Sequence, residues 1–488
     1  MGKTSWTVYD LQVEAMTTPL AIDCDTPRFS WKLGSRARGT MQAAYEIQVF
    51  LEDTGELVWD SGRVEEAWTS EISYQGTALR PRSSYRWTVT AWNMEGDAAL
   101  AEDRFETGLM DARESAWEPA VWIGAPRPGL CANVKGIFWI EARLRIPEGS
   151  CQAGIVFGAK DFRLLDRTKN TSWIQGENYI SYELDISKVP ARLHIYRVGY
   201  HPDDSAQVPF ASVELPQGIM DESRHQFHTL AVEVRGNIAL AYVDGTLVDY
   251  ETANDGSCRG RQLNPLGQND VITFPRLNEI GFTAAPGSAG IFQSLLVRDI
   301  RTPKAVLIQE DAECEDSIFA KAIEEGRLER TEEGFLLCAE RGRTLVTADP
   351  SHTSEPMLRR DFMVRNGAAL KRARLYVTAR GIYDGYVNGA PLTEDWFTPG
   401  ASQYDKHIQY QVYDITKRLQ PGANAMGFYL ASGWWSDAQT YTLMNYNYFG
   451  DRPSLLAMLE LRYEDGTQEV IGTDCESCLL YTSPSPRD

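Results

Sequence analysis

Two alternating segments, Leu358-Arg-Arg-Asp-Phe-Met-Val364 and Ala373-Arg-Leu-Tyr-Val-Thr-Ala379, open the stretch that decides the fold. Apolar and polar residues alternate with a period of two, which is typical of half-buried strands in an antiparallel sheet. Tyr386-Val-Asn-Gly389 then ends in an Asn-Gly pair, which supplies the positive φ angles of a tight hairpin. Two more strand-like segments follow, at 409–416 and 424–435. These segments predict a β-sandwich over residues 351–477, which we expect to be incomplete.

Four short motifs occur in order in this stretch: Ala379-Arg-Gly-Ile-Tyr383, Thr398-Pro-Gly400, Pro421-Gly-Ala-Asn424 and Ser432-Gly-Trp-Trp435. In this order they resemble the N-terminal accessory β-sandwich of bacterial α-L-rhamnosidases, which are glycoside hydrolases of family 78. Several matched motifs over about eighty residues are far more specific than one short motif. The resemblance implies an enzyme family that hydrolyses terminal α-L-rhamnose from glycosides.

The resemblance covers the accessory region of such an enzyme and not its catalytic part. It implies that the missing part is an (α/α)6 barrel that uses two carboxylic acids in an inverting mechanism. No such pair can be placed in this sequence, so no catalytic residue is assigned. We therefore expect a chain that ends before the catalytic barrel and is inactive by itself.

Residues 1–110 carry short strands at regular spacing, and these predict a fibronectin type III or immunoglobulin-like sandwich. We expect Tyr85 and Trp87 to lie in its core. The motifs Pro27-Arg-Phe-Ser-Trp31, Trp59-Asp-Ser-Gly62 and Phe105-Glu-Thr-Gly108 are also similar to the first domain of the rhamnosidase family. This second match lies in the expected order along the chain.

Residues 117–302 are again rich in alternating segments, for example 138–146, 179–186 and 228–234. Such strands, followed by a turn at Val243-Asp-Gly245, are typical of lectin-like jelly rolls and predict a carbohydrate-binding module. The charged residues 303–350 are expected to form a connecting segment. The fold class that follows is all-β, with tandem β-sandwich domains.

A candidate ligand loop in this module comes from the resemblance. In the rhamnosidase family a module at this place can bind terminal rhamnose through calcium, and Phe157-Gly-Ala-Lys-Asp-Phe-Arg-Leu164 resembles its ligand loop. The resemblance implies Asp161 as a calcium ligand, and Asp161 and Arg163 as sugar-binding residues. Calcium takes several oxygen ligands, some of which the loop His201-Pro-Asp-Asp204 could supply. The alternative for Asp161 is a solvated turn aspartate, and for Asp203 and Asp204 a solvated loop is favoured.

The net charge of the chain limits the kinds of molecule that it can bind. Among 488 residues, 48 are Lys or Arg and 68 are Asp or Glu, which gives a formal net charge of -20. Such a charge repels nucleic acid and anionic membranes and suits a neutral ligand. We expect L-rhamnose-containing glycosides or oligosaccharides as partners, with no nucleic acid and no membrane. Because neither a signal peptide nor a transmembrane segment is evident, we also expect a cytoplasmic protein.

The last residues, 478–488, have no strand or helix periodicity. They resemble the conceptual translation of a sequencing-library adaptor, so we expect a non-native tail. The alternative is a native disordered tail rich in Pro and Ser.

Two functions remain open at this point. The first is the accessory, carbohydrate-binding part of an α-L-rhamnosidase. The second is a stand-alone carbohydrate-binding protein built from several β-sandwich domains. A cell-surface adhesion array is disfavoured, because no signal sequence is evident.

Overall fold

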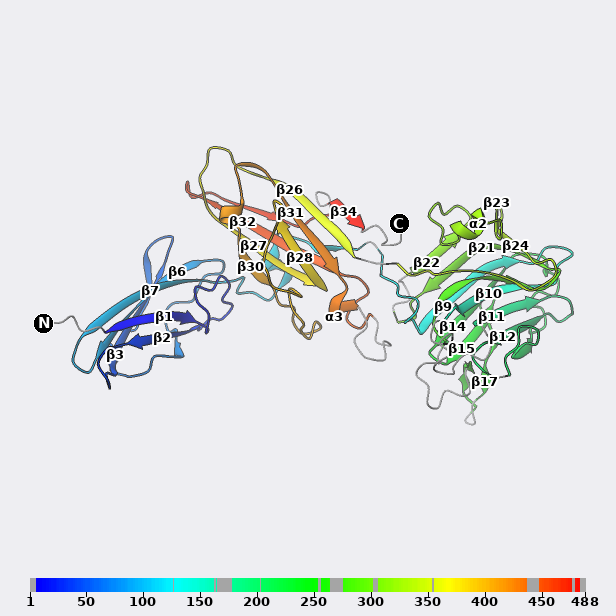
Figure 1. Ribbon diagram of the computed structural model, residues 1–488, viewed down its shortest axis with the longest axis horizontal. Coiled ribbons are helices and arrows are strands. Elements are labelled where there is room, and N and C mark those ends of the chain that lie inside the picture. The colour runs from blue at the N-terminus through cyan, green and yellow to red at the C-terminus, as the bar shows by residue number, and fades with distance from the viewer. Residues whose placement is uncertain are drawn as a thin grey trace. The chain divides into compact units, whose positions relative to one another are not determined.

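The computed structural model consists almost entirely of β-strands (Figure 1), which confirms the predicted all-β class. It describes residues 6–125, 127–161, 164, 178–201, 203–252, 256–263, 275–301, 306–352, 355–436, 447–475 and 479–482. The chain divides into two compact units. The first comprises Met1–Gly124, Met357–Leu430 and Ser454–Tyr481, and the second comprises Ala125–Pro356, Ala431–Pro453 and Thr482–Asp488.

The N-terminal domain of the first unit is a sandwich of two antiparallel sheets, ordered β1-β2-β5 and β4-β3-β6-β7. Its core is aromatic, and the ring centroids of Phe29 and Trp87 lie 4.7 Å apart. Tyr85 and Trp87 are 1% and 0% exposed, so both lie in the core as predicted. The strands are β1 (Thr7–Val13), β2 (Arg28–Gly34), β3 (Gln42–Leu51), β4 (Glu56–Asp60), β5 (Ile72–Ser73), β6 (Ser84–Asn93) and β7 (Ala98–Glu106).

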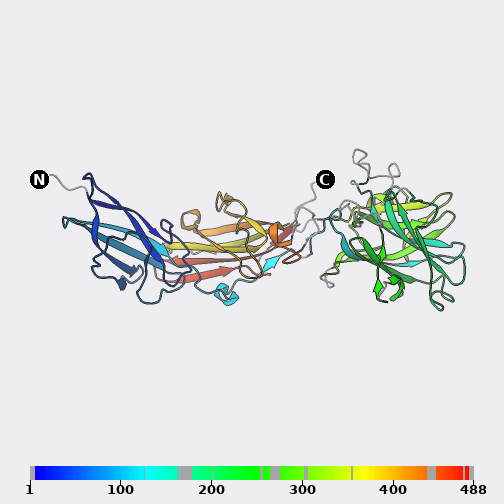
Figure 2. The same cartoon turned by 90° about the horizontal axis from the view of Figure 1, so that it is seen from below.

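The other domain of the first unit is the sandwich predicted around residue 358, and Figure 2 shows its two layers. Its sheets are ordered β29-β28-β31-β26-β34 and β30-β27-β32-β33. Asn388 and Gly389 have φ angles of 51° and 81°, which confirms the predicted Asn-Gly hairpin. The strands are β26 (Pro356–Val364), β27 (Leu370–Arg380), β28 (Ile382–Val387), β29 (Ala390–Pro391), β30 (Gln411–Asp414), β31 (Gly422–Ala431), β32 (Ser454–Tyr463), β33 (Gln468–Gly472) and β34 (Leu479–Thr482).

Two strands of this sandwich come from segments for which the sequence suggests other roles. Strand β8 (Ile123–Gly124) pairs with β32, whereas the sequence pattern assigns residues 117–302, and so this strand, to the predicted carbohydrate-binding module. Strand β34 falls within the expected non-native tail, and its neighbour in the sheet is β26. Residues 478 and 483–488 of that tail lie outside the described residues.

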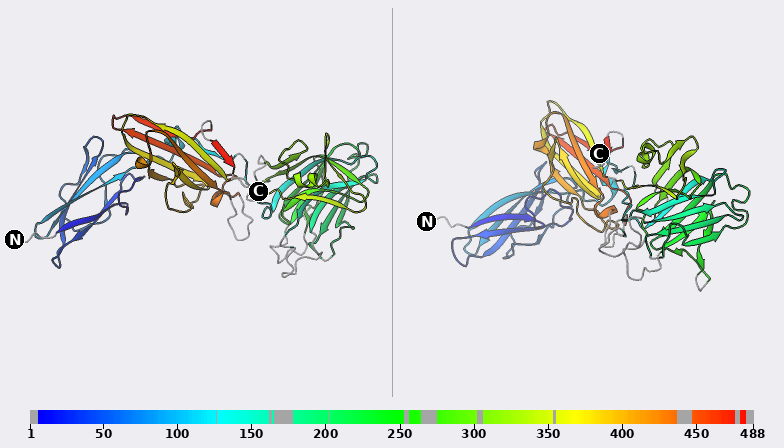
Figure 3. Two further views of the ribbon diagram at one scale, coloured as in Figure 1. Left: turned by 45° about the horizontal axis from the view of Figure 1, so that its top comes forward. Right: turned by 45° about the vertical axis from the view of Figure 1, so that its right-hand side comes forward.

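The second unit is a two-layered β-sandwich, drawn from cyan to yellow-green in Figure 3. Its sheets are ordered β13-β12-β11-β10-β20-β25 and β16-β15-β14-β9-β21-β24-β23. The strands up to residue 298 are β9 (Ile137–Arg145), β10 (Gln152–Ala159), β11 (Tyr179–Asp185), β12 (Arg192–Val198), β13 (Ala211–Glu214), β14 (His228–Arg235), β15 (Ile238–Val243), β16 (Thr246–Asp249), β17 (Glu251–Thr252), β18 (Cys258–Arg259), β19 (Arg261–Gln262), β20 (Glu279–Ala284) and β21 (Ala289–Arg298).

Residues 303–350, expected to be a connecting segment, belong to the body of this sandwich. Strand β25 pairs with β20 in one sheet, while β22 and β24 pair with β21 in the other. Phe319 and Phe335 from this segment are fully buried in the same core as Phe282. The elements are β22 (Val306–Asp311), α2 (Ala320–Glu324), β23 (Glu329–Thr331), β24 (Gly334–Cys338) and β25 (Thr344–Ala348).

The remaining described helices are short: η1 (Glu114–Trp117), η3 (Thr416–Arg418) and α3 (Gly433–Ser436). In the part of the chain that the structure describes, no helix is long and apolar enough to cross a membrane.

Candidate functional site

The predicted ligand loop leaves the sheet at the end of β10. Gly158 and Lys160 have φ angles of 67° and 54°, so the chain turns sharply there. A Cβ atom at Gly158 would lie 2.8 Å from the Tyr200 Oη, so a larger residue does not fit without movement. Tyr200 is buried and donates a hydrogen bond from Oη to the Gly158 carbonyl at 3.1 Å. The start of the loop is therefore fixed against the segment that follows β12.

Asp161 lies at the base of this loop and is only 1% exposed. Its backbone N–H donates to the Asn178 Oδ1 at 2.7 Å, and the Asn178 Nδ2 donates to the Asp161 carbonyl at 3.3 Å. Asn178 is also buried. Its two hydrogen bonds to the Asp161 backbone connect residues 161 and 178. The alternative of a solvated turn aspartate is therefore wrong. Arg163 lies outside the described residues.

The two aspartates of the loop His201-Pro-Asp-Asp204 lie in different environments. The Asp204 side chain is 1% exposed and accepts a hydrogen bond from the Arg197 Nε at 2.7 Å. It also accepts two backbone N–H bonds at 2.8 Å, from Tyr200 and His201. Asp203 is 89% exposed. The expectation of a solvated residue thus holds for Asp203, whereas Asp204 is a buried structural carboxylate.

Calcium takes about six to eight oxygen ligands, often from several carboxylates. Among the described residues, no group of three or more His, Cys, Asp and Glu side chains could hold a metal ion. Asp161 supplies one buried carboxylate at the loop, while Asp204 is already paired with Arg197. The described residues therefore contribute one candidate ligand and do not by themselves complete a calcium site.

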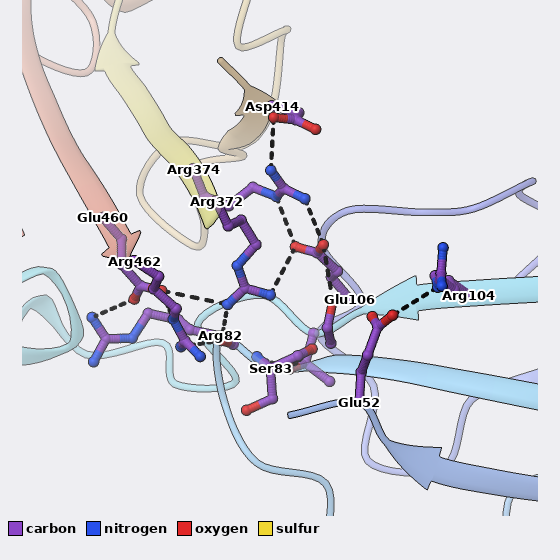
Figure 4. Close-up of polar contacts among 12 residues, drawn as sticks. Glu52, Arg82, Ser83, Arg104, Glu106, Arg372, Arg374, Asp414, Glu460 and Arg462 are labelled. Atoms are coloured by element: carbon purple, nitrogen blue, oxygen red, sulfur yellow. Dashed lines mark hydrogen bonds and ion pairs between the residues drawn. The ribbon is translucent and has the colours of Figure 1, made fainter. Parts of the chain in front are cut away.

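A second polar cluster lies within the first unit, between the N-terminal sandwich and the sandwich around β27 (Figure 4). Arg374 of β27 donates from Nε and Nη2 to the two carboxylate oxygens of Glu106 in β7, at 2.8 and 2.6 Å. Its Nη1 lies 2.8 Å from the Asp414 Oδ1. Arg374 and Glu106 are 6% and 9% exposed, so this two-point ion pair is largely desolvated. It connects two strands that are 268 residues apart in the sequence.

Glu460 of β32 is the other buried acid of the cluster, and its side chain is 1% exposed. The Arg462 Nε donates to its Oε1 at 2.6 Å, and Arg372 lies 3.5 Å from the same oxygen. The guanidinium groups of Arg372 and Arg462 also donate to the backbone carbonyl of Arg82, at 3.2 and 2.8 Å. These contacts attach β27 and β32 to the turn that precedes β6.

A cavity of about 460 Å³ opens beside this cluster, and Asp53 and Asp414 are among its acidic residues. The hydrogen bond from Lys371 lowers the pKa of Asp53. Burial acts to raise the pKa of Asp414, but hydrogen bonds from Thr416 and the charge of Arg374 together lower it. A general acid at neutral pH needs a raised pKa, so these two carboxylates are suited to ion pairing and not to proton donation.

One feature of the sequence points to this junction, although strand periodicity alone does not reveal it. Arg372 and Arg374 lie two residues apart on β27, directly before its apolar run Leu375-Tyr-Val377, so both point to the same face of the strand. Charged residues on a buried face need partners, but the partner Glu106 cannot be identified from local sequence.

The comparisons with known proteins agree with the resemblance carried by both ends of the chain. A family model described as the Rha78A-like N-terminal immunoglobulin domain matches residues 8–111. A second model, the alpha-L-rhamnosidase N-terminal domain, matches residues 368–483. The two matches cover the two sandwiches of the first unit.

An α-L-rhamnosidase from Streptomyces avermitilis is 29% identical over 476 residues, which are 94% of this chain and 39% of that protein. An α-L-rhamnosidase from Formosa agariphila is 34% identical over 117 residues, which are 24% of this chain and 12% of that protein. The crystal structure of the Streptomyces avermitilis enzyme with L-rhamnose aligns with a TM-score of 0.52 and 23% identity, covering 98% of this chain and 41% of that one. The chain thus spans less than half the length of these relatives.

Proposed function

Because the chain carries the two N-terminal domain types of α-L-rhamnosidases, we propose that it is the accessory, carbohydrate-binding part of such a glycoside hydrolase. The alignment with the Streptomyces avermitilis enzyme carries this proposal, since it spans 94% of this chain but 39% of the relative. The full enzyme would remove terminal α-L-rhamnose from glycosides. The chain described here would contribute binding without hydrolysis.

The loop after β10 is the proposed rhamnose-binding site, with Asp161 and Arg163 as its sugar-binding residues and calcium as its metal. Three observations support the loop: it leaves the end of a sheet, Gly158 and Tyr200 fix its start, and Asn178 closes its base. Asp161 would give one oxygen to the metal. When bound, calcium would supply a positive charge on which vicinal hydroxyl groups of the sugar can replace water.

Calorimetric titration of the chain with L-rhamnose, in calcium and then in excess EDTA, tests this proposal. We expect weak binding in calcium, because a monosaccharide offers few contacts and must displace ordered water. We expect no rhamnose binding at this loop in EDTA. Absence of binding in saturating calcium would contradict the rhamnose-binding role, and unchanged binding by an Asp161→Asn variant would contradict the assignment of the loop.

A further inference from the structure

In the second unit, the sheet β16-β15-β14-β9-β21-β24-β23 carries polar and aromatic side chains side by side on its outer face. In β9, Phe138 and Ile140 point into the core, so the alternate residues Trp139 and Glu141 lie on the outer face. Trp139 pairs in register with Glu233 of β14 on one side and with Arg298 of β21 on the other. Side chains paired in register lie on the same face, close enough to form one surface.

A cavity of about 250 Å³ lies over this row, lined by Trp139, Glu141, Glu233, Arg298, Asp299 and Ile300. Pockets for drug-sized molecules measure about 300 to 1,000 Å³, so this one suits a smaller ligand, such as a single sugar ring. The Trp139 ring is held in place by Tyr242, with ring centroids 5.1 Å apart, and by its own Nε1, which donates to the Glu141 Oε2 at 3.1 Å. The indole is therefore a fixed apolar wall.

Two of the four charged residues that line the cavity already have ion-pair partners. Glu233 accepts a hydrogen bond from the Arg235 Nε at 2.5 Å, and the buried Asp299 is paired with the buried Lys135. Within the described residues, neither Glu141 nor Arg298 has an ion-pair partner. The cavity thus keeps one carboxylate that can accept hydrogen bonds and one guanidinium that can donate them, and their charges cancel.

We propose that this cavity is a second sugar-binding site, which takes one neutral pyranose ring. The apolar C–H face of the ring would pack on Trp139, while ring hydroxyls donate to Glu141 and accept from Arg298. A sugar that carries a carboxylate gains no net attraction here, because Glu141 and Arg298 carry opposite charges and Glu233 and Asp299 already have ion-pair partners. A protein partner needs a far larger surface, about 800 Å² per side.

This site is distinct from the proposed rhamnose-binding loop. It lies on β9, β14 and β21, whereas Asp161 follows β10 in the other sheet. Its lining does not include Asp161, the calcium ligand proposed at that loop, and the second site does not depend on a rhamnosidase function.

Saturation-transfer NMR on the full chain in EDTA tests the site, with methyl α-L-rhamnoside, methyl β-D-galactoside and methyl α-D-glucoside as neutral probes and D-galacturonate as the charged probe. Because EDTA removes any binding that needs calcium, the saturation-transfer signal then comes only from glycosides bound at calcium-independent sites. We expect at least one neutral glycoside to bind with a dissociation constant on the order of millimolar. Arg298→Ala and Glu141→Gln should each weaken that binding about five-fold or more, since each removes a hydrogen bond to a charged group.

The matched control is Arg143→Ala, which removes an exposed arginine from the outer face of the same strand outside the cavity lining. Arg143→Ala and Asp161→Asn should both leave chelator-resistant binding unchanged. The proposal is overturned if no neutral glycoside binds in EDTA, if galacturonate binds in preference to all three, or if both cavity variants bind as the wild type does. If rhamnose fails to bind in saturating calcium while a neutral glycoside still binds in EDTA, the Asp161 loop is contradicted and this second site stands.

Discussion

Two acidic residues in turns of the second unit, Asp161 and Asp244, have different roles that single substitutions can separate. Asp244 accepts hydrogen bonds from the His228 Nδ1 at 2.6 Å and from the Thr229 N–H at 2.8 Å. We expect Asp244→Ala to lower stability by about 1 to 2 kcal/mol, since it removes both bonds, and to leave rhamnose affinity unchanged. Asp161→Asn should abolish calcium-dependent binding with a smaller change in thermal midpoint. Thermal unfolding and calorimetry on both variants check this, and equal loss of affinity in the two would contradict it.

A second prediction at the residue scale concerns the ion pair between Arg374 and Glu106. Arg374→Met leaves the Glu106 carboxylate buried beside fewer cations, so we expect a loss of about 3 to 5 kcal/mol. The double variant Arg374→Met with Glu106→Gln should recover part of that loss, because the buried Glu106 charge is then no longer left without Arg374. Denaturant unfolding of the wild type, the two single variants Arg374→Met and Glu106→Gln, and the double variant measures the coupling free energy between the two side chains. Additive losses would mean that the two side chains contribute independently.

The resemblance led to Asp161 from a short loop motif, but the environment of that residue could not be predicted. Its burial depends on Asn178, seventeen positions away, and on the loop start that Tyr200 fixes. In the same way Asp203 and Asp204 are neighbours in sequence, yet one is solvated and the other is paired with Arg197. Contacts from distant segments decide which carboxylates are available.

At the scale of strands, period-two alternation located most of the sheets. It predicted segments that coincide with β9, β11 and β14, because one side of each faces a continuous core. It missed β22 to β25, since these strands are only three to six residues long and charged stretches such as 311–316 and 324–333 interrupt the alternation. It also missed the role of β8, because a two-residue strand carries no period.

The pairing of β34 with β26 leads to a third prediction. Deleting residues 479–488 should expose the edge of β26, lower the thermal midpoint by a few degrees and promote association between copies of the chain. Deleting only residues 483–488 is the matched control, which should leave β34 and the midpoint unchanged. Scanning calorimetry and light scattering at two concentrations check this. Equal midpoints for both deletions would favour the expectation of a foreign tail.

The junction between the two sandwiches of the first unit should weaken in acid. The pKa values of Asp53 and Asp414 are lower in the folded protein than in the unfolded chain. Their contribution to stability is therefore present above about pH 4 and is lost as the pH falls through the lowered folded values. Asp53→Asn with Asp414→Asn should flatten the fall in thermal midpoint between pH 5 and pH 3, values chosen to bracket that window. A slope equal to that of the wild type would show that other carboxylates control the acid response.

At the scale of the whole molecule, the predicted order of sandwiches agrees with the chain, but the units are not consecutive in sequence. Residues of the first unit lie on both sides of the second, at Met1–Gly124 and from Met357 onward. Sequence patterns report strands and turns locally, so they could not show that β8 and β32 share a sheet although 330 residues separate Gly124 from Ser454. The second unit is therefore inserted, in sequence, between two parts of the first.

The last prediction concerns hydrolysis by the chain itself. The described helices are all short, and Asp53 and Asp414, which line the cavity of about 460 Å³ in the first unit, have pKa values shifted away from those of a general acid. An inverting glycosidase needs two carboxyl groups about 6.5 to 9.5 Å apart, one of them with a raised pKa. We therefore expect no turnover of p-nitrophenyl α-L-rhamnoside above a no-enzyme control, even in saturating calcium. The full-length α-L-rhamnosidase of Streptomyces avermitilis serves as the positive control under the same conditions. Turnover that persists after repurification and is removed by Asp161→Asn would show that the loop after β10 takes part in catalysis, and the binding-only role would then be wrong.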